Sequence, residues 1–209
     1  MHWNILDKKR LDILHKFSEL KEFGFYLAGG TGLALQIGHR DSIDFDFFTE
    51  DKIDKEKITQ YVIQNFLQVN KIQDEAGTLT FIVENSIKIS FFEYKYKLIE
   101  SLIATEFFDI ASVPDISCMK LNAICNRNTL KDYVDLYFIF EKNTLDELLN
   151  WTTQKMPELE HMLILKSLIY FDDIIDEPII FKTEPVSIDR IKEKITHIVF
   201  EYQNKLNTI

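Results

Sequence analysis

Two aspartates separated by a single residue are the feature of this sequence that most directly suggests chemistry. Asp44 and Asp46 lie in the stretch Ser-Ile-Asp-Phe-Asp-Phe-Phe-Thr, which alternates apolar and acidic side chains from Ile43 to Phe47. In a β-strand this spacing places both carboxylates on one face, with about 6.5 to 7 Å between their Cα atoms, and the apolar side chains on the other face. Two carboxylates that share a face can bind Mg²⁺, a hard cation that prefers oxygen ligands.

A glycine turn precedes the two acids. Gly29, Gly30 and Thr31 follow a short apolar run and precede a helical pattern, and Asp44 comes thirteen residues after Thr31. Backbone amides of a glycine-rich turn at a helix N-terminus are suited to bind phosphate groups. Alone, the glycine pair also fits a tight turn, and an isolated Asp-x-Asp also fits a solvated strand face. Their combination favours a site that holds a nucleoside triphosphate beside a metal ion.

A second set of charged residues lies further along the chain. If one continuous helix covered this region, Lys120, Arg127, Lys131 and Asp135 would share a face, because they are separated by steps of seven, four and four. Three cations on one face suit a triphosphate. The alternative is a solvated Lys131–Asp135 ion pair, which contributes only about 0.3 to 0.5 kcal/mol. Asparagines on both sides of Arg127 favour a helix break, which would remove the shared face.

The elements that must position these residues fall into two groups. Before about residue 100, strand patterns alternate with amphipathic helical patterns, and beyond it helical patterns dominate. We therefore expect an α+β protein, with a mixed sheet and flanking helices in residues 1–100 and a helical bundle in residues 101–209. The predicted strands are 25–28, 42–49, 78–84, 87–94 and, more weakly, 67–74. The predicted helices are 7–23, 31–37, 54–66, 116–125, 130–140, 145–154, 158–170 and 188–206.

Composition places limits on the class of protein. The 209 residues carry a net charge of −10, so whole-chain charge shows no basic face for nucleic acid. Cys118 and Cys125 lie two helical turns apart, about 10 Å, which is too far for a disulfide, and no zinc-ligand spacing is present. No apolar run approaches the roughly 20 residues that span a membrane. We expect a cytoplasmic protein with reduced cysteines.

Two blocks of the sequence resemble a known family. The first runs from Gly29 to Leu35 and from Gly38 to Phe48, and it is similar to the AbiEii/AbiGii-type nucleotidyltransferases of the DNA polymerase β-like superfamily. The second comprises Asp115-Ile116, 119–124, Arg127 and 131–137, and it matches the family's pattern of Lys, Arg and Lys-Asp-x-x-Asp. The matches cover residues 25 to 140, and no motif is found after residue 141.

The resemblance implies roles for individual residues. Gly30 and Thr31 would hold the β- and γ-phosphates, Asp44 and Asp46 would bind Mg²⁺, and Lys120 would neutralise charge on the triphosphate. The fold implied is the mixed sheet of a polymerase β-like nucleotidyltransferase.

Other family positions complete this implied site. Lys131, Asp132 and Asp135 would form the later site motif, in which the lysine also binds nucleotide. Arg40 and Ser42 lie just before the acid pair, and in such a site they would contact phosphate or ribose.

The resemblance also implies a reaction. A nucleoside monophosphate would pass from the triphosphate to a hydroxyl acceptor, with pyrophosphate released and Mg²⁺ bridging the reacting groups. An RNA such as a tRNA 3′ end is one acceptor implied, with the protein as the toxin of a toxin–antitoxin or phage-defence pair and an antitoxin protein as its partner. Two alternatives stay open: a non-catalytic nucleotide-binding or interaction module, and a nucleotidyltransferase that acts on a small molecule.

One departure from the superfamily's pattern concerns catalysis. These enzymes often use a third carboxylate on a neighbouring strand, and the expected position here is Ser90. Glu93 has the opposite strand parity, so it should point away from that face. We expect that Asp132 or Asp135 substitutes, that the metal alone activates the nucleophile, or that activity is reduced.

Overall fold

Seven short strands of the N-terminal half form one mixed sheet in the computed structural model, which describes residues 1–175 and 177–206. The strand order is β3-β4-β5-β2-β1-β7-β6. Strand β2 is parallel to β5 and antiparallel to β1, and β1 is parallel to β7. The strands are β1 Tyr26–Leu27, β2 Phe45–Thr49, β3 Asn70–Glu75, β4 Thr78–Val83, β5 Ile87–Glu93, β6 Ile103–Ala104 and β7 Asp109–Ile110. The predicted mixed sheet is confirmed.

The chain divides into two compact units, Met1–Ser112 and Val113–Ile209. The boundary expected from the sequence, at residue 100, falls before β6 and β7. Both strands belong to the N-terminal sheet, because β7 pairs with β1 and β6 pairs with β7. Two-residue strands carry too little periodicity to be recognised in a sequence.

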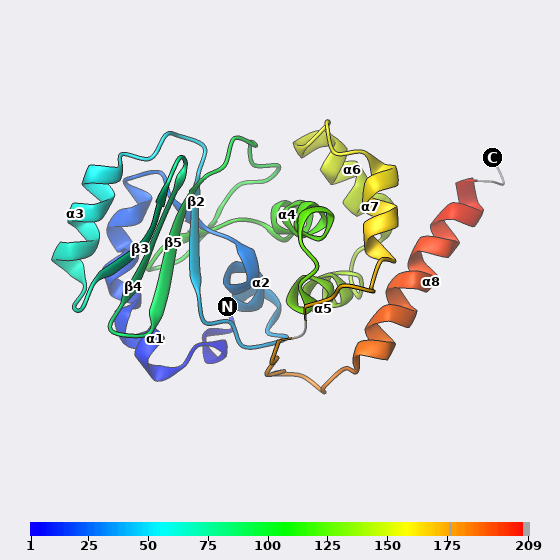
Figure 1. Cartoon of the computed structure of the whole chain (residues 1–209), viewed down its shortest axis with the longest axis horizontal. Helices are drawn as coiled ribbons and strands as arrows, with labels where there is room; N and C mark the ends of the chain where they lie inside the picture. Colours follow the sequence, from blue (N-terminus) through cyan, green and yellow to red (C-terminus); the bar gives the residue numbers. More distant parts are fainter. Residues whose placement is uncertain (176, 207–209) are drawn as a thin grey trace. The chain divides into compact units, whose positions relative to one another are not determined.

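Helical segments pack on one side of the sheet and complete its apolar core. Figure 1 shows α1 and α3 on the same side of the N-terminal sheet. Phe17, in the helical turns after α1, packs its ring 4.8 Å from that of Phe45 and 5.1 Å from that of Phe47. The helical segments of this unit are η1 Trp3–Ile5, α1 Lys8–Ile13, η2 Leu14–Lys21, α2 Gly29–Ile37 and α3 Lys55–Asn65. The helix predicted for residues 7–23 is thus an α-helix followed by 3₁₀ turns.

The two faces of β2 have different surroundings. Phe45 and Phe47 are fully buried on the helix-covered face, whereas Asp46 and Phe48 are half-buried on the other. This alternation was expected, but Ile43 is 52% exposed instead of continuing the apolar face. The strand begins only at Phe45, so Ile43 and Asp44 lie in the segment that leads into it.

The hairpin between β4 and β5 turns one residue earlier than predicted. Glu84 and Asn85 both have positive φ, 49° and 66°, and the Ser86 N–H donates to the Val83 carbonyl. The predicted turn residues were Asn85 and Ser86. The left-handed conformation at two consecutive positions is what a tight hairpin requires.

The C-terminal unit is helical, as expected. Helix α4 packs against α5, α6 and α7, and α8 packs against α5, α6 and α7. The buried stripe of α8 consists of Ile191, Ile195 and Val199, at the four-residue spacing of one helix face. The helices are α4 Val113–Asn126, α5 Leu130–Ile139, α6 Leu145–Lys155, α7 His161–Leu168 and α8 Ile188–Leu206. No helix in the described residues is both long enough and apolar enough to span a membrane.

Both cysteines lie on α4 and neither forms a disulfide, as predicted. Cys118 is buried, and burial raises the pKa of its thiol to about 11. Cys125 is half-buried, and burial also raises the pKa of its thiol. Elevated pKa values leave both thiols protonated and poorly nucleophilic at neutral pH.

Candidate active site

The glycine turn forms the first turn of α2. Strand β1 leads through Ala28 to Gly29, where the helix begins, two residues earlier than predicted. Gly29 has φ +63°, a left-handed conformation that disfavours residues with a side chain. The first N–H groups of a helix lack intrahelical acceptors, so this turn presents the amides of Gly29, Gly30 and Thr31 for an external acceptor.

Asp46 lies directly against this turn. A Cβ atom built on Gly29 would be 3.3 Å from Asp46 Oδ2, and the Ala28 N–H donates to the Asp46 carbonyl at 3.1 Å. The antiparallel pairing of β1 with β2 produces this approach. The carboxylate and the glycine amides therefore share one small region of the sheet surface.

Thr31 connects the turn to the second acid. Its hydroxyl donates to the backbone carbonyl of Asp44 and lies 2.7 Å from the Ser42 hydroxyl. Thr31 is 2% exposed, and its hydroxyl is used in these contacts within the protein. Its backbone amide is therefore the group that remains to bind a phosphate. The side chain of Asp44 itself is 42% exposed.

Arg40 lies beneath the second glycine. A Cβ atom on Gly30 would be 2.7 Å from Arg40 Nη2 and 3.4 Å from the Ser42 hydroxyl. Arg40 is 2% exposed, and its Nη1 donates to the Asp41 carbonyl at 3.0 Å. A guanidinium at this depth adds a fixed positive charge under the turn, which favours an anion above it.

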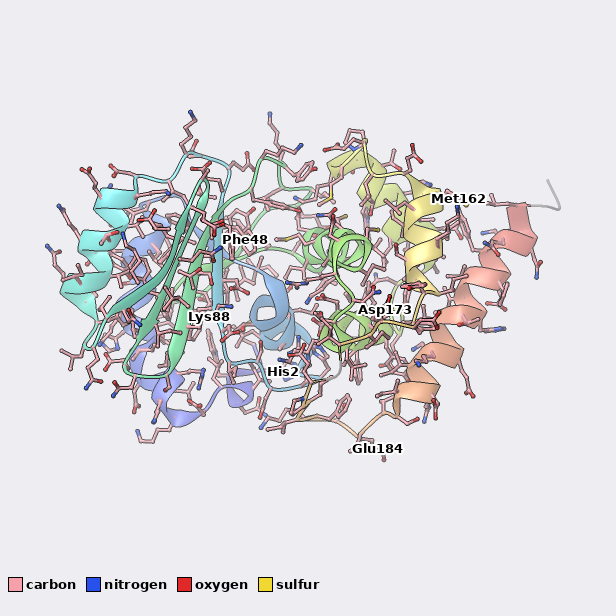
Figure 2. The ribbon with its side chains drawn as sticks, viewed as in Figure 1. His2, Phe48, Lys88, Met162, Asp173 and Glu184 are labelled. Carbon is pink, nitrogen blue, oxygen red and sulfur yellow. The ribbon has the colours of Figure 1, made fainter. Side chains whose placement is uncertain are left out.

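Strand β5 contributes Ser90 and Lys88 to the same sheet face. The parallel register pairs Asp46 with Ser90, which places Asp44 opposite Lys88, and Lys88 Nζ lies 3.9 Å from Asp44 Oδ2. Figure 2 labels Lys88 and Phe48 on this part of the sheet. Ser90 is fully buried, and its hydroxyl has no hydrogen-bond partner among the described residues. Glu93, of opposite parity, is exposed and accepts a hydrogen bond from the Ile53 N–H.

Sequence reasoning missed two cations near the acid pair, Lys88 and Arg10. Arg10, 6% exposed on α1, donates from Nε to the Ile43 carbonyl at 2.5 Å and pairs with Asp7. It thereby fixes the backbone one residue before Asp44. No local signal identifies it, because its acceptor is 33 residues away. Lys88 shares strand parity with Ser90, so the register between β2 and β5 would have revealed it.

The later motif forms a buried ion cluster within the C-terminal unit. Lys120 Nζ lies 2.8 Å from Asp132 Oδ1 and 2.6 Å from Asp135 Oδ2, with both carboxylates at most 1% exposed. Asp132 also accepts hydrogen bonds from Arg127 Nε at 2.9 Å and from the Thr129 hydroxyl at 2.6 Å. Burial opposes ionisation of Asp132, but Lys120 and Arg127 outweigh it and lower the pKa of its carboxyl.

The helix break indicated by the asparagines beside Arg127 is present, and the continuous helix considered against it is not. Helix α4 ends at Asn126 and α5 begins at Leu130, so the shared face does not form. Lys131 pairs with Glu177 at 2.5 Å, and its expected partner Asp135 is instead fully buried against Lys120. The structure therefore brings Lys120, Asp132 and Asp135 together within this unit, while Lys131 is engaged elsewhere.

The acid pair fits Mg²⁺ as part of a shared site. The described residues contain no group of three or more His, Cys, Asp or Glu side chains that could hold a metal ion. Mg²⁺ is commonly bound through one or two carboxylates together with water and substrate phosphates. Asp44 and Asp46, beside a phosphate-type turn, fit that mode of binding and do not form a complete protein cage.

Comparisons with known proteins identify the family of this chain. The family model described as "Nucleotidyl transferase AbiEii toxin, Type IV TA system" matches residues 17–201. The uncharacterized protein aq_aa25 of Aquifex aeolicus is 40% identical over 159 residues, which cover 73% of this chain and 76% of that protein.

Solved structures show the same fold at low sequence identity. A putative nucleotidyltransferase from Helicobacter pylori has a TM-score of 0.59 at 16% identity and covers 97% of this chain and 98% of its own. MenT4, a nucleotidyltransferase toxin from Mycobacterium tuberculosis, has a TM-score of 0.62 at 15% identity, with coverage of 90% and 82%. Because the family model spans both sequence blocks and most of the chain, this protein belongs to the AbiEii family of nucleotidyl transferase toxins, and its activity is nucleotidyl transfer.

Proposed function

We propose that this protein transfers a nucleoside monophosphate from a nucleoside triphosphate to a hydroxyl acceptor, with Mg²⁺ held by Asp44 and Asp46. The observation that supports this most is the 3.3 Å approach of Asp46 Oδ2 to the Cβ position of Gly29. It means that a metal ligand and the amides of the turn can act on one triphosphate. In-line displacement then depends on positioning and electrostatics.

Each proposed site residue of the N-terminal unit has a defined role in this proposal. The amides of Gly29, Gly30 and Thr31 donate to the β- and γ-phosphates, and Arg40 adds positive charge beneath them. Ser42 holds Thr31 in place through its hydroxyl. Mg²⁺, when bound, stabilises charge on the attacking and leaving oxygens.

The later family motif supplies the second group of proposed site residues. Lys120 neutralises charge on the triphosphate, and Asp132 and Asp135 position its ammonium group. Lys131 provides a further cation at the start of α5 and is paired with Glu177 in this structure. The two acids hold the ammonium group of Lys120 in one position, which reduces the entropy lost when it meets an anion.

Ser90 affects how the acceptor hydroxyl can be deprotonated. It occupies the strand position opposite Asp46, and a serine cannot act there as a carboxylate base. Asp132 and Asp135, the substitutes considered from sequence, are committed to Lys120. No carboxylate of this set is then left to act as a base towards the acceptor hydroxyl, and we expect slow transfer compared with enzymes that have a third carboxylate.

We propose RNA, such as a tRNA 3′ end, as the acceptor, an antitoxin protein as the partner, and Mg²⁺ as the metal. The family's description as the toxin of a toxin–antitoxin system supports this role. Ser90 in place of a carboxylate favours a second candidate, a module that binds nucleotide without transfer. A small-molecule acceptor is the third, and it suits the net charge of −10.

Transfer can be tested with each α-³²P-labelled triphosphate, total RNA and Mg²⁺. We expect label on RNA with the native protein, and a loss of about 100-fold or more in Asp46→Asn and Asp44→Asn. Asp51→Asn is the matched control, because Asp51 is an exposed acid just after the same strand. Equal transfer by Asp46→Asn and the native protein would refute the assignment of the acid pair. Tight triphosphate binding without transfer to any acceptor would support the non-catalytic module.

A further inference from the structure

A pocket of about 460 Å³ lies within the C-terminal unit, away from the residues assigned above except for Arg127. It is formed by the end of α4, the turn that leads to α5, and the end of α7 with the segment that follows it. Its volume is within the range of small-molecule sites, about 300 to 1,000 Å³. Neither the sequence motifs nor the proposed function gives this pocket a role.

Two cations line the pocket. Lys166, in the last turn of α7, is exposed and makes no ion pair with the residues that the structure describes. The side chain of Arg127 is 61% exposed, although its Nε and Nη2 contact Asp132. Asp173, which is labelled in Figure 2, also lines the pocket and accepts a hydrogen bond from the Tyr170 hydroxyl at 2.6 Å. Asp132 offsets much of the charge on Arg127, and Asp173 adds a negative charge of its own, so the exposed ammonium group of Lys166 is suited to a single phosphate and not to the several charges of a triphosphate.

Two asparagine side chains that line the pocket have hydrogen-bonding groups that are not used within the described residues. Asn126 uses its NH₂ group on Asn122, and its Oδ1 accepts no hydrogen bond within the described residues. Asn128 Oδ1 receives a long hydrogen bond from Tyr133, while its NH₂ group donates none in the described part of the chain. The wall therefore presents one acceptor and one donor, the combination that reads the edge of a nucleobase.

An aromatic ring completes the lining. Tyr170 is 45% exposed, so its ring is available for stacking. Nucleobases stack on such rings in single-strand binding proteins, whatever their sequence. Together with Arg127, the exposed ring leaves the pocket accessible from solvent, so a strand can enter and leave it.

We propose that this pocket binds one nucleotide of a single-stranded RNA, and this rests on the proposed function because that RNA is the acceptor. Lys166 and Arg127 hold one phosphodiester, Asn126 and Asn128 contact the base edge, and Tyr170 stacks on the base. Arg127 and Lys120 bind the two oxygens of the same Asp132 carboxylate, so the pocket adjoins the proposed triphosphate lysine. RNA held here is anchored beside one member of the transfer site.

Binding is measured by the anisotropy of a fluorescent single-stranded RNA in EDTA, where no transfer can occur. Lys166→Gln removes one phosphate contact, so we expect weaker binding and a slope of log Kd against log salt that falls by about 0.7. Tyr170→Leu should weaken binding by about tenfold. Lys142→Gln is the matched control, since Lys142 is also exposed and without an ion pair among the described residues, and it should bind as the native protein does.

Cys125 reports on occupancy of the pocket itself. It lines the pocket and is half-buried, whereas Cys118 is buried. We expect RNA to slow alkylation of Cys125 by iodoacetamide at mildly alkaline pH, and Lys166→Gln to weaken that protection.

Three outcomes separate the possibilities. Native-like RNA affinity and salt slope in Lys166→Gln, with Cys125 unprotected, would overturn the proposal. Saturable protection of Cys125 by nucleoside triphosphates but not by RNA would assign the pocket to the free nucleotide and also overturn it. RNA binding that depends on Lys166 and Tyr170, without any label transfer in Mg²⁺, would support the pocket while contradicting the proposed function.

Discussion

Gly29 stands at the most constrained position of the proposed site. Its φ of +63° and the 3.3 Å separation between a Cβ atom placed there and Asp46 Oδ2 both exclude a side chain without local change. Gly77, in the turn between β3 and β4, has nearly the same constraints, with φ +71° and a carboxylate oxygen of Glu93 at 3.3 Å. Comparing the same substitution at the two glycines therefore separates the effect of backbone strain on stability from a specific effect on activity.

Replacing either glycine by alanine should lower the free energy of unfolding by a similar amount, about 1 to 2 kcal/mol. Only Gly29→Ala should also impair nucleotidyl transfer, because it displaces Asp46 and distorts the amides of the turn. Urea unfolding measures the first quantity, and label transfer from α-labelled triphosphate measures the second. An equal loss of transfer in Gly77→Ala would show that strain alone explains the effect.

At the scale of elements, buried ion pairs connect helices of the C-terminal unit. Lys155 on α6 and Asp115 on α4 lie 2.7 Å apart, and both side chains are fully buried. A buried ion pair adds little to the free energy of unfolding when compared with apolar residues of similar shape. Removing one partner, however, leaves the other charge buried without its counter-ion, which is strongly destabilising. The Lys120 cluster follows the same rule between α4 and α5.

Lys155→Met should lower the free energy of unfolding by about 3 to 5 kcal/mol, because the Asp115 carboxylate loses its ammonium partner. The control is Lys8→Met, which removes a lysine from the Lys8–Asp12 pair with side chains 86% and 59% exposed. That change should have an effect below about 1 kcal/mol. Chemical denaturation followed by circular dichroism measures both variants. Similar effects would contradict the importance of burial.

At the scale of the whole molecule, titratable groups define a pH range of stability. Lys120 and Arg127 lower the pKa of Asp132. Hydrogen bonds from Lys55 and Lys71 lower the pKa of Asp74 to about 2. Such groups stabilise the fold above their unfolded pKa, near 3.8, and this stabilisation is lost as pH falls through the folded value. In contrast, burial raises the pKa of Cys118 to about 11 from 9.0. Its stabilisation is present below pH 9 and is lost as pH rises towards 11.

The midpoint of urea unfolding should therefore be highest between about pH 5 and pH 8 and should fall on both sides. Asp132→Asn should flatten the acid side, because its side chain does not titrate. Cys118→Ala should flatten the alkaline side between pH 9 and 11. Unchanged pH profiles in both variants would show that other groups control the pH dependence.

Several elements could be predicted because the residues that determine them lie close together in the sequence. Periodicity gave α8 with its observed bounds, Ile188–Leu206, and the alternation of Phe45, Asp46 and Phe47 gave the two faces of β2. Spacing also linked the Gly29 turn to the acid pair, since both belong to one contiguous motif. In each case the residues that decide the structure lie within a few turns or one strand of each other.

Other features depended on partners distant in the sequence. The break between α4 and α5 allows Lys120 to meet Asp132 and Asp135, which a continuous helix would have placed differently. Lys88 lies near Asp44 only because β5 pairs in parallel with β2.

The sequence by itself determined the family, the order of most helices and strands, and the acids and glycines proposed to carry the chemistry. Tertiary structure alone decided which charges neutralise one another, that Arg10 holds the backbone before Asp44, and that a polar pocket forms where α4 and α7 end. The physical reason is that hydrogen-bonding periodicity and turn preferences act between near neighbours. Ion pairs, strand register and cavities arise only when distant segments pack together.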